Sequence, residues 1–268
     1  MIETSKISEA LGAMTENIVL HHSSAVALDT RGLSQGGRGI GSVAAVQKPH
    51  GAEESNFYIN PASAPDKPFQ LILKRGMDIV GSLFGLAVLV PLLLMIAGLI
   101  KLESRGPVLF RQIRTGLNDV PFEILKFRSM YSESCDHSGV AQTTDNDPRI
   151  TRLGKILRKT NLDELPQLWN VLIGDMSLVG PRPHVPDMLA AGRNYSDLVQ
   201  GYDYRHLMRP GLTGLSQARG LRGPTTHRWV AIRRIVCDVE YIRNFSILLD
   251  VKIILRTIVN ELRGGTGL

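Results

Sequence analysis

The chain has 268 residues, a formal net charge of +6 and two cysteines. This length is enough for one catalytic domain with appendages or for two small domains. The positive charge indicates an anionic partner, and nucleic acid, an anionic membrane surface and a phosphorylated substrate all satisfy it. Cys135 and Cys237 are isolated and the seven histidines lack ligand spacing. They indicate neither disulfides nor structural zinc, as expected in a reducing cytoplasm.

Residues 1–66 mix Ser, Gly, Ala, Asn and Pro without a sustained period, as in "SQGGRGIGSVAAVQ" and "INPASAPDKP". This composition predicts a flexible N-terminal extension. The segment also lacks a basic start followed by an apolar core and a cleavage site. A secretory signal peptide is therefore not expected.

An uncharged run follows at residues 79–100, "IVGSLFGLAVLVPLLLMIAGLI". As a straight helix it would be about 33 Å long, against a bilayer hydrocarbon core of about 30 Å. However, Pro91 lies near its middle, where proline removes a backbone hydrogen bond at a cost of about 3 kcal/mol in a straight helix. Basic residues flank both ends, and cytoplasmic flanks attract Lys and Arg. The run is therefore either a re-entrant helix bent at Pro91 or a single-pass anchor.

The segment "PFEILKFRSM", residues 121–130, predicts a strand. Period-2 alternation places Lys126 and Arg128 on one face, where a pair of cations suits a phosphate. The alternative is an exposed strand face with solvated charges.

The next segment, "DPRITRLGKILRKT" at residues 147–160, predicts a basic amphipathic helix. Ile150, Leu153 and Leu157 recur at helical spacing, and cations occupy much of the other side. Such a helix lies either at a lipid headgroup layer or against a protein core with a solvated basic face. The neighbouring apolar run favours the membrane surface.

Two adjacent acids open the stretch "TNLDELPQLWN", residues 160–170. Asp163 has the position of a helix N-cap, with Pro166 inside the first turn, so a structural role alone explains the pair. The same helix end favours an ionised carboxylate, which a nucleophile or metal ligand must be. Capping and catalysis are compatible, and both interpretations stay open at this point.

Two arginines follow in turn-rich segments, "GDMSLVGPRPH" and "RPGLTGLSQARG". Prolines on both sides of Arg182 restrict the loop that presents its guanidinium, and Arg209 precedes a Pro-Gly turn. Each alone is an exposed arginine in a turn. Together with the carboxylate pair and the membrane segment they predict phosphoryl transfer at a membrane interface.

From about residue 70 onward the chain closely resembles the bacterial sugar transferases, the monotopic polyprenyl-phosphate phosphoglycosyl transferases. Five motifs occur in the family's order. They are "KRGMDIVGSLFGLAVLVPLL", "GPVLFRQIRTG", "FEILKFRSM", "DPRITRLGKILRKTNLDELPQLWNVLIGDMSLVGPRP" and "RPGLTGLSQ". One motif would be weak evidence, whereas five in sequence are specific.

The resemblance implies a short, catalytic-only member with a mixed α/β, mainly helical fold. Behind the extension, residues 67–101 would form a re-entrant membrane helix kinked at Pro91. Residues 102–268 would form a small cytoplasmic catalytic domain with interfacial amphipathic helices. The chain departs from the family pattern at Asn161, where Ser is common, and at Val90, where some relatives have Ser before the proline.

The resemblance also implies the chemistry. Asp163 would attack the β-phosphorus of a UDP-sugar, with Glu164 as its partner, releasing UMP, and a polyprenyl (undecaprenyl) phosphate would then accept the phosphosugar. Mg²⁺ would bind at Asp163. The cations expected to bind the phosphates or nucleotide are Arg158, Arg182, Lys126, Arg128 and Arg209.

The expected location is the bacterial inner membrane, with the enzyme monotopic on the cytoplasmic face, in contact with its lipid and without nucleic acid. The expected role is the first membrane step of exopolysaccharide synthesis, with glucose or galactose as the sugar. Downstream glycosyltransferases and a second copy of the chain stay open as partners. The competing functions are a lipid-phosphate binding or regulatory module without turnover, and a membrane-anchored phosphodiesterase.

Overall fold

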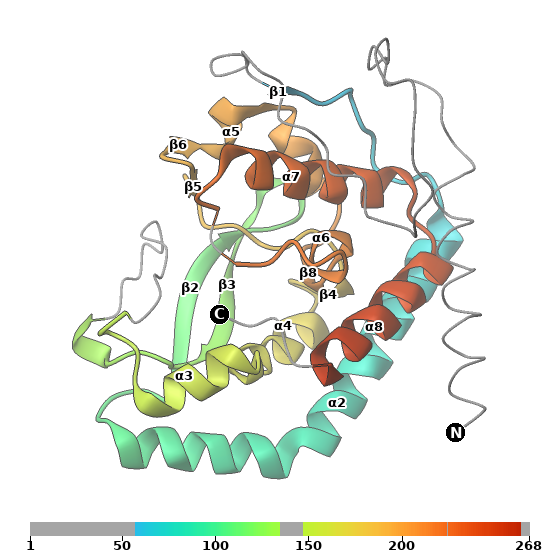
Figure 1. The fold of residues 1–268 in the computed structure, drawn as a ribbon. Coiled ribbons are helices and arrows are strands. Elements are labelled where there is room, and N and C mark those ends of the chain that lie inside the picture. Colours follow the sequence, from blue (N-terminus) through green and yellow to red (C-terminus); the bar gives the residue numbers. More distant parts are fainter. Residues whose placement is uncertain (1–56, 135–146, 224, 264–268) are drawn as a thin grey trace, which may run out of the picture. The chain divides into compact units, whose positions relative to one another are not determined.

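A computed structural model describes residues 57–134, 147–223 and 225–263 (Figure 1). The chain divides into two units, residues 1–52 and 53–268, and all described residues belong to the second. Its helices are α2 (Pro68–Glu103), α3 (Arg152–Lys159), α4 (Gln167–Ile173), α5 (Tyr195–Leu198), α6 (Leu215–Ala218), α7 (Arg228–Arg243) and α8 (Ile247–Leu262). Its strands are β1 (Phe57–Tyr58), β2 (Leu109–Thr115), β3 (Pro121–Phe127), β4 (Ser177–Val179), β5 (Leu189–Ala190), β6 (Arg193–Asn194), β7 (Val199–Gln200) and β8 (Gly211–Thr213).

The predicted fold class is confirmed as mixed α/β with helices predominating. Among the described residues the strands form four two-stranded sheets. The longest is the antiparallel hairpin of β2 and β3, in which Phe110 is opposite Lys126 and Gln112 is opposite Ile124. Directly opposite residues share a face, so this register places β2 side chains beside Lys126.

Helix α2 contains the whole uncharged run and is bent partway along its length (Figure 1). Pro91 lies inside it, and a proline is a usual cause of a sharp kink. We call residues 68–90 the first arm and residues 91–103 the second arm. In the second arm Ile96 and Ile100 are buried against Phe127 of β3 and Leu157 of α3.

The first arm is attached to the rest of the unit by polar side chains. The contacts are Lys74 Nζ to Asp250 Oδ2 (2.7 Å), Arg75 Nη1 to the Val171 carbonyl (2.7 Å) and Ser177 Oγ to Asp78 Oδ1 (2.9 Å). Lys74 and Asp250 are both buried. Buried charges are retained only when paired, so this ion pair fixes the arm on α8.

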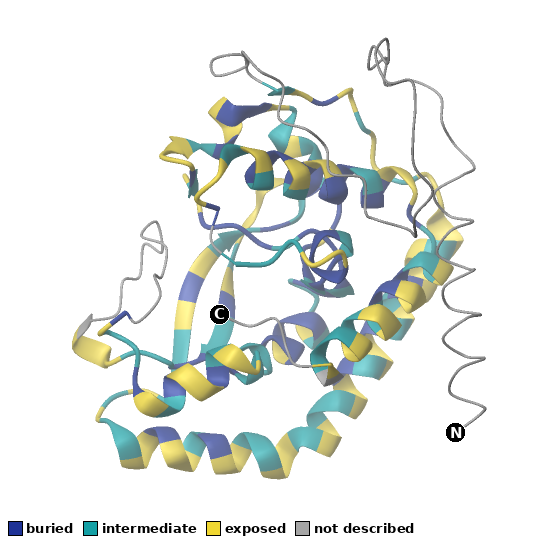
Figure 2. Cartoon of the chain, viewed as in Figure 1, coloured by how far each residue is buried: buried dark blue, intermediate teal, exposed yellow. Residues whose placement is uncertain are grey.

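The outer surface of α2 is apolar and exposed (Figure 2). Along both arms the exposed side chains include Phe69, Ile72, Val80, Phe84, Val88, Leu94 and Leu102. By length and composition α2 could cross a membrane. An apolar patch of this size on a protein surface indicates contact with lipid or with another protein.

Of the expected flexible extension over residues 1–66, the structure describes residues 57–66. Residues 1–56 lie outside the described part of the chain, but β1 pairs in parallel with β7, and Ile59 is buried in a core cluster with Leu198 and Val199. Composition alone missed this short strand, because a two-residue strand leaves no periodic pattern.

The predicted basic amphipathic helix corresponds to α3. Its N-cap is Thr151, whose side chain accepts a hydrogen bond from the Gly154 N–H. Leu157 is buried, whereas Arg152, Lys155 and Lys159 are exposed. Ile150 precedes the helix and forms a bridge with Met130, which brings α3 to the end of the β2–β3 hairpin.

Candidate active site

The two adjacent acids lie in a three-residue 3-10 turn, Leu162–Glu164, between α3 and α4. Asp163 is therefore not the N-cap of α4; that position belongs to Pro166, without a side-chain cap. Asn161, at the start of the turn, has φ 54° and ψ 16° in the left-handed region, which Asn tolerates better than most residues. The turn leaves Asp163 only 9% exposed. A carboxylate buried to this degree requires charged or polar neighbours.

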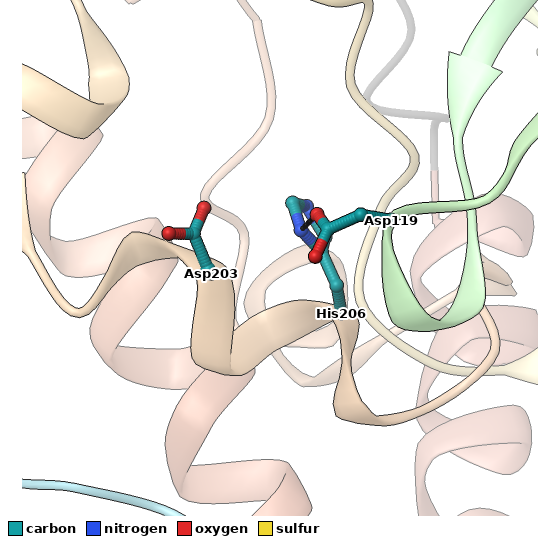
Figure 3. Close-up of side chains that lie close together, drawn as sticks. All are labelled: Asp119, Asp203 and His206. Atoms are coloured by element: carbon teal, nitrogen blue, oxygen red, sulfur yellow. Dashed lines mark hydrogen bonds and ion pairs between the residues drawn. The ribbon is translucent and has the colours of Figure 1, made fainter.

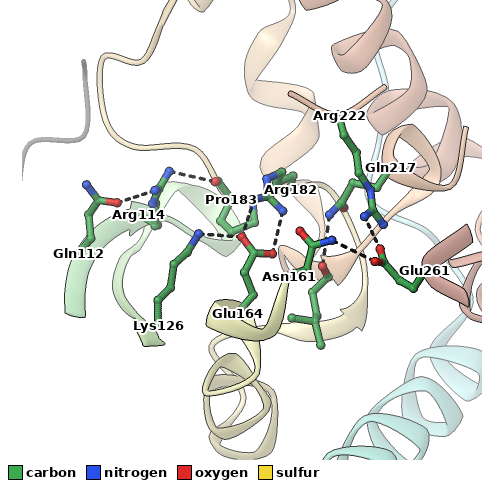
Figure 4. A network of polar contacts seen from close by, with 11 residues as sticks. Gln112, Arg114, Lys126, Asn161, Glu164, Arg182, Pro183, Gln217, Arg222 and Glu261 are labelled. Atoms are coloured by element: carbon green, nitrogen blue, oxygen red, sulfur yellow. Dashed lines mark hydrogen bonds and ion pairs between the residues drawn. The ribbon is translucent and has the colours of Figure 1, made fainter. Parts of the chain in front are cut away.

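Glu164 is held by two cations from distant segments (Figure 4). Lys126 Nζ donates to Glu164 Oε1 at 2.7 Å. Arg182 approaches the same carboxylate with two nitrogens, at 2.6 Å from Oε1 and 3.2 Å from Oε2. This two-pronged contact is the strong form of an arginine–carboxylate bond. We call Asp163 and Glu164 the dyad, and the turn that carries them the dyad turn. The contacts of Glu164 thus connect this turn to β3, through Lys126, and to the Pro-Arg-Pro loop, through Arg182.

The two carboxyl groups have opposite electrostatic environments. Burial alone would raise the pKa of Glu164, but Arg182 and Lys126 lower it well below its usual value. Burial raises the pKa of Asp163 to about 6, and the neighbouring Glu164 charge adds to this, against the opposing effects of Lys126, Arg158 and Arg182. Glu164 is therefore the fixed anion and Asp163 the group that titrates close to neutrality. Such divergence of two adjacent acids is typical of catalytic sites.

Arg158 lies in the last turn of α3, and its charge is among those that lower the pKa of Asp163. Of the predicted site residues, the structure thus brings together Asp163, Glu164, Lys126, Arg182 and Arg158. A cation near a carboxylate favours the ionised form that a nucleophile needs.

Arg114 of β2 is a site residue that the sequence interpretation missed. Its Nη2 donates to Gln112 Oε1 at 2.5 Å, and its Nη1 points to the Pro183 carbonyl at 3.4 Å (Figure 4). Its Nε is buried and has no hydrogen-bond partner among the described residues. Burial, and then the nearby Arg182, lower the pKa of Arg114 to about 10. A guanidinium that has no carboxylate partner in the described part of the chain can bind an anion.

The loop that carries Arg182 is fixed through its carbonyl oxygens. Prolines at 181 and 183 have no N–H to donate. Instead Arg205 donates to the Arg182 carbonyl, and Arg114 approaches the Pro183 carbonyl. Arg205 is 1% exposed and also pairs with Asp238 at 2.9 Å. The buried Arg205–Asp238 pair therefore supports the backbone of Arg182.

Two predicted phosphate-binding residues have other contacts. Arg128 is buried and donates to the carbonyls of Ser104 (2.8 Å) and Arg105 (2.8 Å), just beyond the end of α2. Guanidinium donors at the end of a helix satisfy carbonyls that have no helical partner. Arg209 is exposed and donates from Nε to the Gly174 carbonyl at 2.8 Å. Both groups are bonded to backbone oxygens and neither contacts the dyad among the described residues, so phosphate binding by Arg128 and Arg209 stays a prediction.

The residues at the dyad fit a divalent cation in one respect. Within the described part of the chain the Asp163 carboxylate accepts no hydrogen bond, whereas both oxygens of Glu164 are bonded. Mg²⁺ is commonly bound by one or two carboxylates together with substrate phosphates. Asp163 could therefore hold it. Glu164 could not do so without giving up its cations.

A separate cluster, Asp119, Asp203 and His206, has potential ligand atoms within 4.8 Å of one another (Figure 3). His206 Nδ1 lies 2.5 Å from Asp119 Oδ1, and this direct hydrogen bond accounts for their proximity. Both aspartates are exposed. None of the three residues belongs to the dyad, so the cluster gives no support for a metal at Asp163.

Comparison with known proteins gives consistent matches. The model of a family described as bacterial sugar transferase matches residues 69–264. An exopolysaccharide production protein PSS from Rhizobium leguminosarum bv. phaseoli is 58% identical over 197 residues, covering 74% of this chain and 98% of the relative.

Two further relatives have names that state a reaction. A UDP-glucose:undecaprenyl-phosphate glucose-1-phosphate transferase from Caulobacter vibrioides is 51% identical over 185 residues, covering 69% of this chain and 68% of that protein. An undecaprenyl-phosphate glucose phosphotransferase from Komagataeibacter xylinus is 48% identical over 198 residues, covering 74% of this chain but only 37% of that protein.

Proposed function

The chain belongs to the bacterial sugar transferase family, and on this premise we propose that it transfers a sugar 1-phosphate from a UDP-sugar to a polyprenyl phosphate. The relatives from Caulobacter and Komagataeibacter are named for glucose and undecaprenyl phosphate. UDP-glucose is therefore the first substrate to test, ahead of UDP-galactose. The product would be a membrane-bound sugar diphosphate lipid that begins an exopolysaccharide unit.

In the proposed first step the ionised Asp163 carboxylate attacks the β-phosphorus of the UDP-sugar. A new bond joins the carboxylate oxygen to that phosphorus, the bond to the bridging oxygen breaks, and UMP leaves with the electron pair. In the second step an oxygen of polyprenyl phosphate attacks the aspartyl-phosphosugar, which restores the carboxylate. Splitting one transfer into two displacements is the general advantage of a covalent intermediate.

The remaining side chains of the site bind the diphosphate of the substrate and orient the reacting groups. Lys126, Arg182 and Arg114 carry three positive charges, against the two negative charges of Glu164 and the ionised Asp163. The site therefore has excess positive charge that matches the diphosphate and the charge on departing UMP. Glu164 fixes the two cations that contact it and, through its own charge, raises the pKa of Asp163. A bound Mg²⁺ would add neutralisation of phosphate charge, with Asp163 as its protein ligand.

One observation carries this proposal: Asp163, a buried carboxylate that accepts no hydrogen bond from the described residues, lies beside a cationic cluster organised by Glu164. The test is a panel of UDP-sugars assayed for UMP release with and without polyprenyl phosphate. Sustained UMP release that requires the lipid supports the transferase. Sustained release without lipid would indicate a phosphodiesterase, and binding without release a regulatory module.

We also propose that α2 enters and leaves the same membrane leaflet. Both of its ends contact one compact unit: the first arm through Lys74 and Asp250, and the second through Ile96, Ile100 and Glu103, whose carboxylate accepts the Leu153 N–H. A helix spanning the bilayer would separate its ends by about 30 Å of hydrocarbon. The exposed apolar surface between the docked ends is the part proposed to enter lipid.

The stripe of exposed apolar side chains on α8 supports a membrane-facing surface beyond α2. It comprises Leu248, Val251, Leu255, Ile258 and Val259, which recur at helical spacing. Ile156 of α3 is an exposed apolar side chain as well. We infer an interfacial role for both helices, with the site at the cytoplasmic surface of the inner membrane, where nucleotide sugars are found.

The pKa of Asp163 predicts the acid limb of the pH profile. Because this pKa is raised to about 6, the carboxylate is half ionised near pH 6 and protonated below it. We expect kcat/KM to rise with pH by up to about tenfold per unit below pH 6 and to level off above pH 7. Initial UMP-release rates between pH 5 and 8 measure this, with activity recovered at pH 7.5 as the check on folding. A flat profile from pH 5 to 7 contradicts the assignment.

Replacing Arg114 by alanine should weaken the reaction with UDP-sugar. Hydrogen bonds to charged groups contribute about 1.5–3 kcal/mol, so we expect kcat/KM to fall about ten- to a hundredfold. Arg111→Ala is the matched control, because Arg111 lies on the other face of β2 and pairs with Glu123 at the surface. Its kcat/KM should stay within about twofold of wild type. Equal effects of the two substitutions would remove Arg114 from the site.

A further inference from the structure

The turn that carries the dyad depends on Asn161. The Asn161 carbonyl accepts the Glu164 N–H at 3.2 Å, so the left-handed backbone of Asn161 and the position of the second acid are directly linked. A turn of three residues has little stability of its own, and Asn161 makes no side-chain cap within it. The conformation of the turn must therefore be fixed from outside.

The side chain of Asn161 supplies that outside contact. Its Nδ2 donates to Glu261 Oε2 at 3.1 Å, across a separation of 100 residues in sequence (Figure 4). Arg222 Nη1 donates to the other oxygen of Glu261. The side chains of Arg222 and Glu261 are 13% and 30% exposed. A half-buried carboxylate thus links an arginine of the loop after α6 to the residue that begins the dyad turn.

Glu261 is presented by a well-anchored part of α8. Thr257 Oγ1 lies 2.7 Å from Thr213 Oγ1 of β8, and Asn260 Nδ2 donates to the Ala218 carbonyl of α6 at 3.2 Å. These contacts fix the helix on the side from which Glu261 reaches Asn161. A side chain on a fixed helix can hold a partner in a defined position.

We propose that Glu261 is a positioning residue for the dyad, acting through the amide of Asn161 and neutralised by Arg222. The inference rests on the proposed transfer reaction. Glu261 acts by geometry, since the charges with the largest effect on Asp163 are those of Glu164, Lys126, Arg158 and Arg182. Loss of the contact should therefore lower the rate of the chemical step, with little effect on substrate binding or on the pH profile.

The test compares single and double variants in detergent-purified full-length protein. Glu261→Ala should lower kcat about ten- to a hundredfold, as expected when a reacting group is displaced by about 1 Å, with KM for the UDP-sugar within about twofold. Glu261→Gln retains an oxygen that accepts from Asn161 and should recover most of the activity. Asn161→Gly keeps a residue suited to positive φ but removes the amide. Its kcat should fall by the same factor as that of Glu261→Ala.

Coupling between Asn161 and Glu261 decides whether the two residues act through their mutual hydrogen bond. If both act through one contact, the double variant should be no slower than either single variant, whereas independent effects multiply. Asn244→Ala is the matched control, because it removes an exposed amide hydrogen bond to the Glu240 carbonyl at the end of α7, which contacts neither Glu261 nor the dyad turn. It should keep kcat within about twofold. The acid limb near pH 6 should be unchanged in Glu261→Ala.

Three results would overturn the inference: wild-type kcat in Glu261→Ala, multiplied losses in the double variant, or an equal loss of kcat in Asn244→Ala. A fall in melting temperature without a fall in kcat would show a merely structural contact. If the wild type releases no UMP from any UDP-sugar, the proposed function fails instead. The contact itself is then tested by thermal unfolding, where additive effects of Asn161→Gly and Glu261→Ala would contradict it.

Discussion

Replacing Asp163 by asparagine should abolish sugar-phosphate transfer while the protein stays folded. The amide has nearly the shape of the carboxylate but cannot form the aspartyl-phosphosugar. We expect kcat to fall on the order of 10⁴-fold or more, as when a nucleophile or its partner is removed from other enzymes. UDP-glucose radiolabelled in its glucose moiety tests for the covalent intermediate directly. Labelled protein should accumulate in wild type when polyprenyl phosphate is absent, and none should form in the variant.

The stability of Asp163→Asn separates chemistry from folding. Since the pKa of Asp163 is raised from its ordinary 3.8 to about 6, folding disfavours the ionised form. Above pH 6 its charge therefore lowers the free energy of unfolding. This penalty disappears as pH falls through 6 towards 4, because the carboxyl is then protonated in the folded state. The uncharged variant should thus be as stable as wild type or more so at pH 7.5, with the difference shrinking at acid pH.

Asp197→Asn is the control for this substitution, because Asp197 is exposed in the first turn of α5 and takes no part in the site. It should leave both rate and melting temperature unchanged. If folded Asp163→Asn retains near-normal turnover, Asp163 has no covalent role. Glu164 would then be the remaining acid, but its carboxylate is held by Lys126 and Arg182.

The sequence predicted the members of the site better than their contacts. Period 2 correctly placed Lys126 on a strand, but β3 ends at Phe127, one residue before Arg128. Arg128 therefore follows the strand and meets the carbonyl groups at the end of α2. Those carbonyls need donors, and only the fold shows that this arginine reaches them.

Arg114 was missed for a related reason. Its place beside the cationic cluster follows from the β2–β3 register and from its approach to the Pro183 carbonyl. A hairpin prediction over residues 109–127 could have found the register, since residues opposite each other on paired strands share a face. The contact of Arg114 with the Pro183 carbonyl joins residues 69 positions apart in the sequence, and no local pattern encodes it.

The capping interpretation of Asp163 was wrong because it relied on the motif Asp-x-x-Pro as a helix start. In the structure Pro166 precedes α4 as its N-cap, and the acids occupy a separate turn. A cap would have pointed the Asp163 carboxylate at backbone N–H groups. In the actual turn it accepts no hydrogen bond from the described residues and lies among cations, which suits the catalytic alternative.

The second large effect concerns the topology of α2. Cysteines introduced at Asn60 and Arg105, on exposed positions flanking the helix, should both react with a membrane-impermeant maleimide only after the inner membrane is opened. A cysteine at Val88, exposed on the apolar surface, should be shielded under both conditions. The native cysteines are first replaced by serine or alanine, and an exported copy of a single-cysteine protein confirms that the reagent labels the periplasmic side.

We expect the two flanking cysteines to lie on the same side of the membrane because both arms of α2 are docked on the rest of the unit. Moving Asn60 to the periplasm would carry the first arm with it and separate Lys74 from Asp250. Removing one partner of a buried ion pair is destabilising by about 3–5 kcal/mol, and both residues are buried here. The second arm would have to leave Phe127 and Leu157, which cover Ile96 and Ile100. Labelling of Asn60→Cys in intact cells would therefore establish a spanning helix and contradict the docked arrangement, although the chemistry of the dyad could survive that result.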